Sequence, residues 1–325
     1  MRRNGDDLSL ARCSKYAMGE AIRGRGVRAV GQAICKDWSN AKAFIDEIDA
    51  AAPFKIVVKP NQSAGSDDVF LCDSEGDVKR AFDKINGAIN GLGIVNEGVL
   101  LQEFLCGKEY VVDSVSRDGR HKVTAVWEYD KRHVNDQFNV YFGMKLRCVD
   151  DEVMESIVEY QRSVLDALEI RNGPAHAEIM MTDTGPCLVE VGSRCHGGEG
   201  TWQPISDSCL GYNQIDATLD SYIRPDEFDK IPALPRDMTC NGREVFLVSR
   251  IEGVIKSIPG IDIVMNLKSF VKCEMCVQPG DNLKKTIDCF TRPGSIQLMH
   301  EDEKVVERDY ERIRELEIEG MFVLE

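Results

Sequence analysis

Two carboxylates in one predicted hairpin have the types and spacing that most clearly indicate chemistry. Glu178 and Glu190 lie in AHAEIMMTDTGPCLVEVG, residues 175–192, each among apolar neighbours on a predicted strand. The turn is predicted near 183–186, and the midpoint between the acids, residue 184, falls inside it. Antiparallel pairing then places the acids side by side, where they repel unless a cation or proton lies between them. Hard oxygen ligands suit Mg²⁺. We therefore predict a metal site; the alternative is that one acid is solvated at a sheet edge.

Arg194 follows Glu190 by four residues in the run CLVEVGSRCHGG. The spacing allows a salt bridge between the two or a reaction centre. Because Glu178 is the predicted partner of Glu190, we expect Glu190 to face a metal ion instead of forming a salt bridge with Arg194. His176 shares the strand face of Glu178. His196 either reaches substrate or caps a turn.

A loop of small residues follows Lys59, which ends an apolar strand predicted over 55–59. The loop KPNQSAGS lacks the spacing of a Walker motif. Four of its residues allow backbone N–H groups to point at an anion: Ser63, Ala64, Gly65 and Ser66. A flexible hairpin tip is the alternative.

The stretch QEFLCGKEY offers a third candidate. The strand predicted over 98–105 ends in a segment whose backbone could hydrogen-bond a flat heterocycle, with Glu103 at hand. Six residues later Glu109 opens the next strand, where it could accept from a pair of hydroxyls. A surface glutamate near a Gly-Lys turn explains Glu109 about equally well.

Helices and hairpins that mix along the chain position these residues, which indicates an α+β fold. Helical periodicity and capping predict helices over 9–24 (capped by Ser9), 39–51, 74–89 (capped by Ser74 or Asp73), 149–168, 211–223 and 302–318. Strand patterns predict single strands over 55–59, 69–72 and 98–105. They predict one hairpin that joins 109–119 to 121–130 and a second hairpin over 175–192. Three or four further strands are predicted among 244–250, 253–258, 268–277 and 294–299. Prolines mixed with charge predict a linker near 225–240.

Composition limits the partners. The chain has 325 residues, 43% of them hydrophobic, and a net charge of -15. An acidic surface is poorly suited to nucleic acid, and we find neither a signal peptide nor an apolar run long enough for a membrane span. We expect a soluble, cytoplasmic protein that binds neither nucleic acid nor membrane. The twelve scattered cysteines are expected to be buried thiols.

Together these pieces resemble the ATP-grasp superfamily. The resemblance covers most of the chain and is carried by an ordered set of motifs: RCSKYAMGEAIRGRG, VVKPNQSAGS, LLQEFLCGKEYVVDSV and HAEIMM…LVEVGSR. It is nearest to the carboxylate–amine ligases, including L-amino-acid and dipeptide ligases, where an Arg four residues after the second metal Glu is typical. The tail SRIEGVIKSIPG…PGSIQLMHED resembles the C-terminal domain of that branch.

The resemblance implies a role for each candidate residue. Lys15 and Lys59 would contact the ATP phosphates and adenine, and the loop from Ser63 to Ser66 would close over the phosphates. The adenine hinge would be formed by Gln102, Glu103, Phe104 and Leu105, and Glu109 would contact the ribose. Glu178 and Glu190 would be ligands of Mg²⁺ or Mn²⁺, and Arg194 would stabilise an acyl phosphate and a tetrahedral intermediate. Lys131 and Lys145 match less closely and are further candidates for phosphate contact.

The implied activity is ATP-dependent ligation of a carboxylate and an amine, with amino acids as substrates. The carboxylate attacks the γ-phosphate, and the amine then attacks the acyl phosphate; the protein positions the reactants and neutralises charge. The sequence also allows a homo-oligomer.

The implied architecture is an ATP-grasp fold, with two α+β subdomains sandwiching ATP and a small β-rich C-terminal domain. The ranges would be a helical segment 1–52, a lid 53–105, a large subdomain with the metal site 106–226, and a C-terminal α+β domain 240–325.

Two departures from the family pattern stand out. Glu190-Val191-Gly192 lacks the Asn of the common Glu-x-Asn motif, which leaves the number of metal ions open. The α/β domain that usually precedes this fold is missing, so the sequence is either a shortened enzyme or a fragment. The alternative function is an ATP-binding protein that is non-catalytic, or truncated and in need of a partner.

Overall fold

The computed structural model describes residues 3–48, 54–63, 65 and 67–325. The chain forms two compact units that alternate along the sequence. The first comprises 1–112, 116–121 and 152–194, and the second 113–115, 122–151 and 195–325. Lys15, Lys59, Glu109, Glu178 and Glu190 therefore all belong to the first unit.

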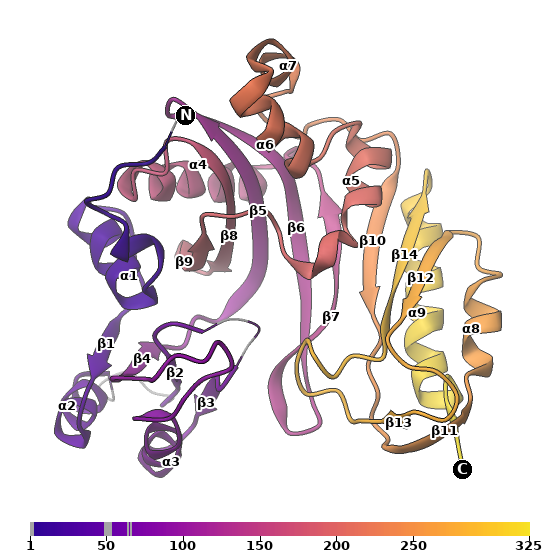
Figure 1. Cartoon of the computed structure of the whole chain (residues 1–325), viewed down its shortest axis with the longest axis horizontal. Helices are drawn as coiled ribbons and strands as arrows, with labels where there is room; N and C mark the ends of the chain where they lie inside the picture. Colours follow the sequence, from indigo (N-terminus) through magenta and orange to yellow (C-terminus); the bar gives the residue numbers. More distant parts are fainter. Residues whose placement is uncertain (1–2, 49–53, 64, 66) are drawn as a thin grey trace. The chain divides into compact units, whose positions relative to one another are not determined.

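An antiparallel sheet of four strands forms one part of the first unit (Figure 1). Its order is β1 (Gln32–Cys35), β4 (Val99–Glu103), β2 (Ile56–Pro60) and β3 (Phe70–Cys72). Helices α2 (Trp38–Ile48) and α3 (Glu75–Ile85) share a core with these strands, to which Phe44, Ile45, Val58, Phe82 and Leu101 contribute. The sequence pattern predicts no strand at β1, which has only four residues. The predicted end of the helix over 39–51 lies partly outside the described residues.

Helix α3 shows how local sequence sets this packing. The Ser74 side chain accepts a hydrogen bond from the Asp77 backbone N–H at 3.2 Å, which satisfies one of the unpaired donors at the helix start. The predicted cap and apolar face are confirmed, since the residues at helical spacing are buried: Val78, Phe82 and Ile85. The helix ends at Ile85 instead of residue 89, because Asn86 already has an extended backbone with a ψ of 119° and Gly87 follows with a φ of 76°.

The other part of the first unit places three strands in the order β5 (Gly107–Arg117), β8 (Gly173–Thr182) and β9 (Gly185–Gly192). Helices α4 (Glu152–Ala167) and α1 (Lys15–Gly24) pack beside β9. The predicted hairpin over 175–192 and the predicted helix over 149–168 are thus confirmed, with slightly different ends.

The prediction of one helix over 9–24 is wrong in one respect that matters for the site. Residues Leu10–Arg12 form a separate 3₁₀ turn, η1, and α1 begins at Lys15. Ser9 has helical backbone angles and makes no capping bond, whereas Ser14 is extended and accepts from the Ala17 N–H at 3.2 Å. Lys15 is therefore the first residue of α1.

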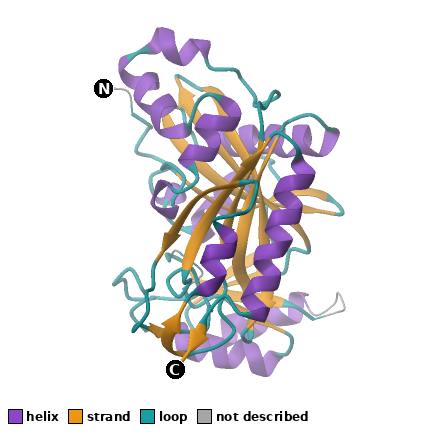
Figure 2. Cartoon of the chain, turned by 90° about the vertical axis from the view of Figure 1, so that its right-hand side faces the viewer, coloured by secondary structure: helices purple, strands orange, loops and turns teal. Residues whose placement is uncertain are grey.

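The second unit is built on five strands in the order β12 (Phe270–Met275), β14 (Gly294–His300), β10 (Asn241–Phe246), β7 (Gln137–Arg147) and β6 (Arg120–Val134). A small sheet of β13 (Asn282–Leu283), β11 (Gly253–Ser257) and β15 (Val323–Leu324) accompanies it. Helices α8 (Pro259–Val264) and α9 (Glu303–Glu319) cover the strands, as Figure 2 shows with helices in purple. Their shared core includes Val306, Tyr310 and Ile313.

Further helices follow the β9 strand: η2 (Gly198–Gly200), α5 (Gln203–Leu210), α6 (Gln214–Ile223) and α7 (Pro225–Lys230). The predicted linker over 225–240 therefore contains a short helix, and Lys122 donates to its Phe228 carbonyl at 2.7 Å. Strand β7 and helix α5 lie in stretches for which the sequence pattern predicts no element. The strands predicted over 244–250, 253–258, 268–277 and 294–299 are all present with shifted ends.

None of the twelve cysteines, all of which lie in the described part of the chain, forms a disulfide. Cys35, Cys72, Cys187 and Cys209 are buried as expected. The expectation is wrong for Cys13, Cys106 and Cys276, which are exposed.

Candidate functional site

The β8–β9 hairpin brings the two predicted acids opposite each other. Glu178 pairs with Glu190, and the hairpin closes where Thr182 pairs with Gly185. A two-residue turn at this point would by itself place Val189 opposite Glu178. A β-bulge between Glu178 and Ile179 on the β8 side, where β9 contributes the additional Val189, shifts the register by one residue. The predicted pairing of the acids is confirmed, and the bulge is what produces it.

Lys15 is the cation beside this acid pair. Its Nζ lies 2.9 Å from Glu190 Oε2 and donates to the Ser63 carbonyl at 2.7 Å. The start of α1 is tied to the loop after β2, because the Lys15 N–H donates to the Asn61 carbonyl at 3.2 Å and Ser14 exchanges side-chain hydrogen bonds with Asn61. Glu190 thus forms an ion pair with Lys15.

Lys59, the fourth residue of β2, adds a second positive charge. It is 5% exposed, and its pKa is lowered to about 8 by burial first and then by the charge of Lys15. Three carboxylates act to raise the pKa of Lys59, namely those of Glu190, Glu178 and Glu109. The first unit therefore gathers three acids and two lysines from α1, β2, β5, β8 and β9. Such a set can hold anions and cations together.

His176 and Arg194 flank the acids along the chain. His176 Nε2 lies 3.7 Å from Glu178 Oε1 on β8, as expected for residues on one strand face. Arg194 lies two residues past the end of β9 and is exposed. Its side chain folds toward Gly192, where an added Cβ would come within 3.3 Å of Arg194 Cγ and Nε.

The predicted hinge is held from the side by the segment around β1. The Gln102 side chain donates to Gln32 Oε1 at 3.0 Å, and Glu103 accepts from the Gly31 N–H at 3.0 Å. Lys55 Nζ lies 5.3 Å from the centre of the Phe104 ring, and Leu105 continues the chain toward β5. These contacts fix the side chains and leave the role of the backbone in binding a heterocycle as a prediction.

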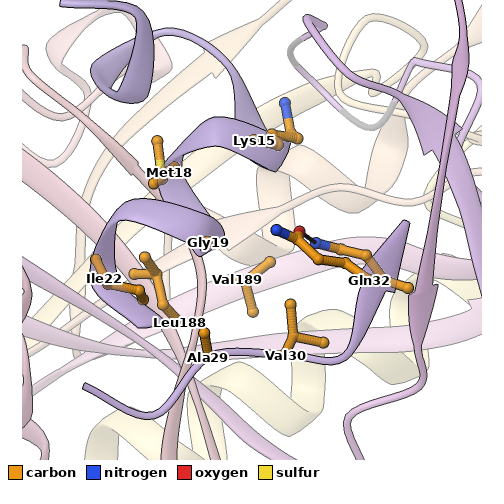
Figure 3. Close-up of a pocket in the computed structure, with 10 residues that line it drawn as sticks. Lys15, Met18, Gly19, Ile22, Ala29, Val30, Gln32, Leu188 and Val189 are labelled. Carbon is orange, nitrogen blue, oxygen red and sulfur yellow. Dashed lines mark hydrogen bonds between the residues drawn. The ribbon is translucent and has the colours of Figure 1, made fainter. Parts of the chain in front are cut away.

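A pocket opens beside Lys15 in the same unit (Figure 3). Apolar side chains and two glutamines line it: Met18, Gly19, Ile22, Ala29, Val30, Gln32, Gln102, Leu188 and Val189, together with Lys15. The bulged residue Val189 and the hinge residue Gln102 both take part. The pocket thus combines apolar walls with few polar groups, as small-molecule sites do.

The loop predicted to cover phosphate is described only in part. Ser63 contributes its carbonyl to Lys15, and Gly65 has a φ of 70°, a conformation that favours glycine. Ala64 and Ser66 lie outside the described residues. Asp67 accepts a hydrogen bond from the Gly91 N–H at 2.6 Å.

Lys131 and Lys145 belong to the second unit. Lys131 Nζ lies 4.6 Å from the ring centre of Tyr129 and 4.3 Å from that of Tyr141. Lys145 Nζ lies 2.5 Å from Glu303 and 2.9 Å from Glu307 at the start of α9. Both lysines have partners within their own unit, and their contact with phosphate stays a prediction.

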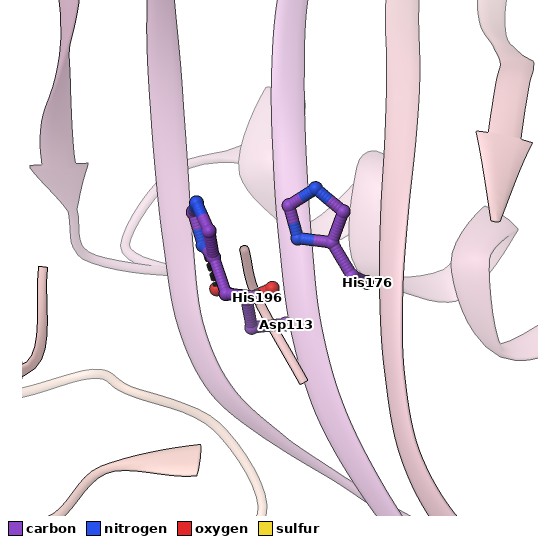
Figure 4. Close-up of side chains that lie close together, drawn as sticks. All are labelled: Asp113, His176 and His196. Carbon is purple, nitrogen blue, oxygen red and sulfur yellow. Dashed lines mark hydrogen bonds and ion pairs between the residues drawn. The ribbon is translucent and has the colours of Figure 1, made fainter. Parts of the chain in front are cut away.

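One feature of the second unit has no counterpart among the predicted site residues. Asp113 on β5 accepts from His196 (Figure 4). It also accepts from Trp127. No local signal marks Asp113, which stands in an ordinary strand sequence, VVDSVS. Only its partners, distant in the sequence, reveal it.

Comparisons with known proteins agree with this arrangement. A family model described as an ATP-grasp domain matches residues 52–203. Dapdiamide A synthase of Enterobacter agglomerans is 30% identical over 320 residues, which cover 97% of this chain and 73% of the relative. An L-arginine-specific L-amino acid ligase of Bacillus subtilis is 25% identical over 203 residues, 60% of this chain and 46% of the relative. The crystal structure of an L-amino acid ligase from Bacillus licheniformis matches with a TM-score of 0.77 at 17% identity, over 98% of this chain and 73% of that one.

The chain belongs to the ATP-grasp superfamily, and the family and fold predicted from the sequence are confirmed. Its activity is that of an ATP-dependent ligase that joins a carboxylate to an amine. Among the described residues, no helix is both long and apolar enough to cross a membrane.

Proposed function

We propose that the chain activates an amino-acid-like carboxylate with ATP as an acyl phosphate and transfers the acyl group to the amine of a second amino-acid-like substrate. The observation that carries this proposal is the cluster in the first unit. Glu178 and Glu190 are opposed in register, Lys15 lies 2.9 Å from Glu190, and Lys59 is buried within the field of both acids. This combination suits a nucleotide phosphate that arrives with a divalent cation.

The acid pair fits Mg²⁺, with Mn²⁺ as a substitute. Two opposed carboxylates offer hard oxygen ligands, and their need for a positive charge is evident from the ammonium of Lys15 beside Glu190. Glu178 and Glu190 would hold the ion, which when bound would neutralise charge on the ATP phosphates. Val191 and Gly192 offer no third side-chain ligand after Glu190.

The lysines would hold the phosphates themselves. Lys15 stands at the N-terminal end of α1, where helix dipole and ammonium both favour an anion. Lys59 is a buried donor that gains most from an anionic partner, because its charge is poorly solvated. The loop around Ser63 and Gly65 would approach the phosphates with its backbone.

The nucleoside would lie along the hinge. Gln102 to Leu105 supply backbone groups for adenine, and Glu109, 8% exposed at the start of β5, would accept from the ribose hydroxyls. The pocket beside Gln102 and Val189 supplies apolar surface in the same region of the unit.

Arg194 would act on the reacting carboxylate. A carboxylate oxygen attacks the γ-phosphorus, and the bond to ADP breaks. The amine then attacks the acyl carbon, the C–N bond forms, and phosphate leaves with the electrons of the C–O bond. Both steps build negative charge near the acyl group, and an exposed guanidinium at the end of the β9 strand is suited to stabilise it.

The substrate class follows from the relatives. One is named as a dapdiamide synthase and another as an L-amino acid ligase specific for L-arginine. We therefore propose amino-acid-like molecules for both the carboxylate and the amine.

The test is a two-dimensional screen of carboxylates against amines with ATP and Mg²⁺, in which ADP is measured and products are identified by mass spectrometry. We expect ADP release that depends on one acid–amine pair and equals the amide formed. Tight ATP binding without any substrate-dependent ADP would contradict the proposal.

A further inference from the structure

The second unit brings two thiols into direct contact. Cys209, in helix α5, and Cys240, directly before strand β10, have their Sγ atoms 3.1 Å apart. This separation is only about 1 Å longer than the S–S bond of a disulfide. The two cysteines are 31 residues apart in the sequence and share no motif, so the fold alone pairs them.

Main-chain contacts hold the two segments together independently of the thiols. The Thr239 N–H donates to the Cys209 carbonyl at 2.8 Å, and the Thr239 hydroxyl donates to the Ser208 carbonyl at 2.7 Å. Gly242, near the start of β10, is also close to α5, because a Cβ added there would lie 3.0 Å from the Cys209 sulfur. The contact between the thiols therefore follows from how the end of α5 packs against the start of β10.

The two thiols differ in their access to solvent. Cys209 is fully buried, and burial is the main cause that raises the pKa of its thiol, with its hydrogen bond to Cys240 acting in the same direction. Cys240 is only half-buried. A dissolved oxidant therefore reaches Cys240 first, while Cys209 keeps its proton until a reaction at Cys240 calls on it.

We propose that Cys209 and Cys240 form a reversible disulfide when the protein meets a peroxide. The Cys240 sulfur attacks one oxygen of hydrogen peroxide, the O–O bond breaks, and Cys240 becomes a sulfenic acid as water leaves. The Cys209 sulfur then attacks the Cys240 sulfur, the S–O bond breaks, and a second water leaves with the proton of Cys209. Two thiols are oxidised, and the peroxide is reduced by two electrons.

This disulfide would join the end of α5 to the start of β10. The loop that it closes contains α6 and α7. A cross-link of this kind restricts the unfolded chain, so oxidation should make the second unit harder to unfold. A dithiol reductant reverses the step by thiol–disulfide exchange. The inference does not depend on the proposed function.

The experiment treats the intact chain with hydrogen peroxide, blocks the remaining thiols and digests the protein without reductant. Peptide mapping by mass spectrometry should identify peptides joined through Cys209 and Cys240 as the dominant linked pair. Their mass should be lower by two hydrogen atoms than the sum of the separate peptides, and dithiothreitol should separate them. Urea unfolding before and after oxidation should show a higher midpoint for the linked protein.

Cys240→Ser places a hydroxyl where the attacking sulfur stands. This variant should lose both the link and the rise in midpoint, while its unfolding without peroxide stays close to that of the reduced unaltered chain. Cys276→Ser is the matched control, because Cys276 is exposed directly after strand β12 of the same unit and has no role in the proposed step. It should keep both the link and the rise.

Two outcomes would overturn the inference. The first is the absence of a link between Cys209 and Cys240 at peroxide concentrations that already oxidise the exposed Cys276. The second is unselective pairing, in which Cys240 is joined to the exposed Cys13 or Cys106 as often as to Cys209.

Discussion

Lys15 supplies the positive charge that the opposed glutamates require. Its ammonium contacts Glu190 and also the Ser63 carbonyl at the start of the loop after β2. Phosphate oxygens would compete with both contacts for the same donor. Lys15 thus couples the acid pair to the loop. A ligand that binds the Lys15 ammonium would change its contact with the acid pair and its contact with the loop.

At the residue scale we expect substitutions of Glu190 and of Arg194 to reduce turnover for different reasons. Glu190→Gln removes one of the two carboxylate charges and should reduce Mg²⁺-dependent turnover by at least about 10²-fold. Arg194→Ala should reduce turnover by about 10²–10³-fold and leave ATP affinity unchanged, because its charge is used only on the acyl group. Steady-state rates and calorimetric ATP titration measure the two effects.

Glu169→Gln is the control for loss of an ion pair alone. Glu169 pairs with Arg25 at 2.9 Å in the same unit, and both side chains are well exposed. Such pairs contribute little to stability. Turnover that remains intact in Glu190→Gln would show that the acid pair holds no catalytic metal.

At the scale of elements, the cap of α1 should link stability to ATP binding. Ser14→Ala removes the side chain that accepts from Ala17 and bonds to Asn61, so the unfolding free energy should fall by about 1 kcal/mol. Because Lys15 is the next residue, ATP affinity should fall as well. Denaturant unfolding and ATP titration check the two parts.

Ser74→Ala provides the matched comparison for this cap. Ser74 caps α3 through the Asp77 N–H with the same 3.2 Å geometry, and it has no assigned role in binding. The Ser74→Ala substitution should lower the free energy of unfolding by a similar amount and leave ATP affinity unchanged. An equal loss of ATP affinity in both variants would mean that α1 does not specifically position Lys15.

Elements with strong local signals could be predicted from the sequence. Helix α3 has its cap and apolar spacing, and the β8–β9 hairpin has its turn between alternating strands. Strand β1 is too short for periodicity to stand out, and the break between η1 and α1 depends on Ser14 finding Asn61 far along the chain. Local patterns cannot report a bond between segments that meet only after folding.

The site residues divide in the same way, into those that a local pattern predicts and those that depend on contacts between distant segments. Glu178 and Glu190 could be paired from the sequence because one hairpin contains both. The ion pair of Lys15 with Glu190 and the bond of Asp113 with His196 join distant segments, so one sequence contains no local evidence of either. The family resemblance supplied the role of Lys15 but not its partner.

At the scale of the whole molecule, the net charge of -15 is accompanied by a buried acid with an altered pKa. Burial raises the pKa of Glu244 from 4.5 to about 7, and Thr201 donates a hydrogen bond to its carboxylate. The folded state therefore holds this proton more tightly than the unfolded state does. The resulting stability is complete below about pH 4.5 and is lost as the pH rises through about 7.

Glu244→Gln should remove this pH dependence, since its amide is neutral at every pH and can still accept from Thr201. Between about pH 5 and about pH 8, the unaltered chain should lose up to about 3 kcal/mol of unfolding free energy relative to the variant. Urea unfolding at several pH values measures the difference. Parallel curves for the two proteins would show that Glu244 stays ionised when folded.

The bulge at Val189 also has an arithmetic consequence. In a regular hairpin with a two-residue turn, every odd-numbered position faces an even-numbered one, as Thr182 faces Gly185. Glu178 and Glu190 are both even, so no bulge-free version of this hairpin could set them opposite each other, whatever its side chains. Parity thus restricts how the spacing of the two acids can change: a relative whose acids stand one residue closer needs no bulge, whereas one that keeps this spacing and turn must keep the extra residue.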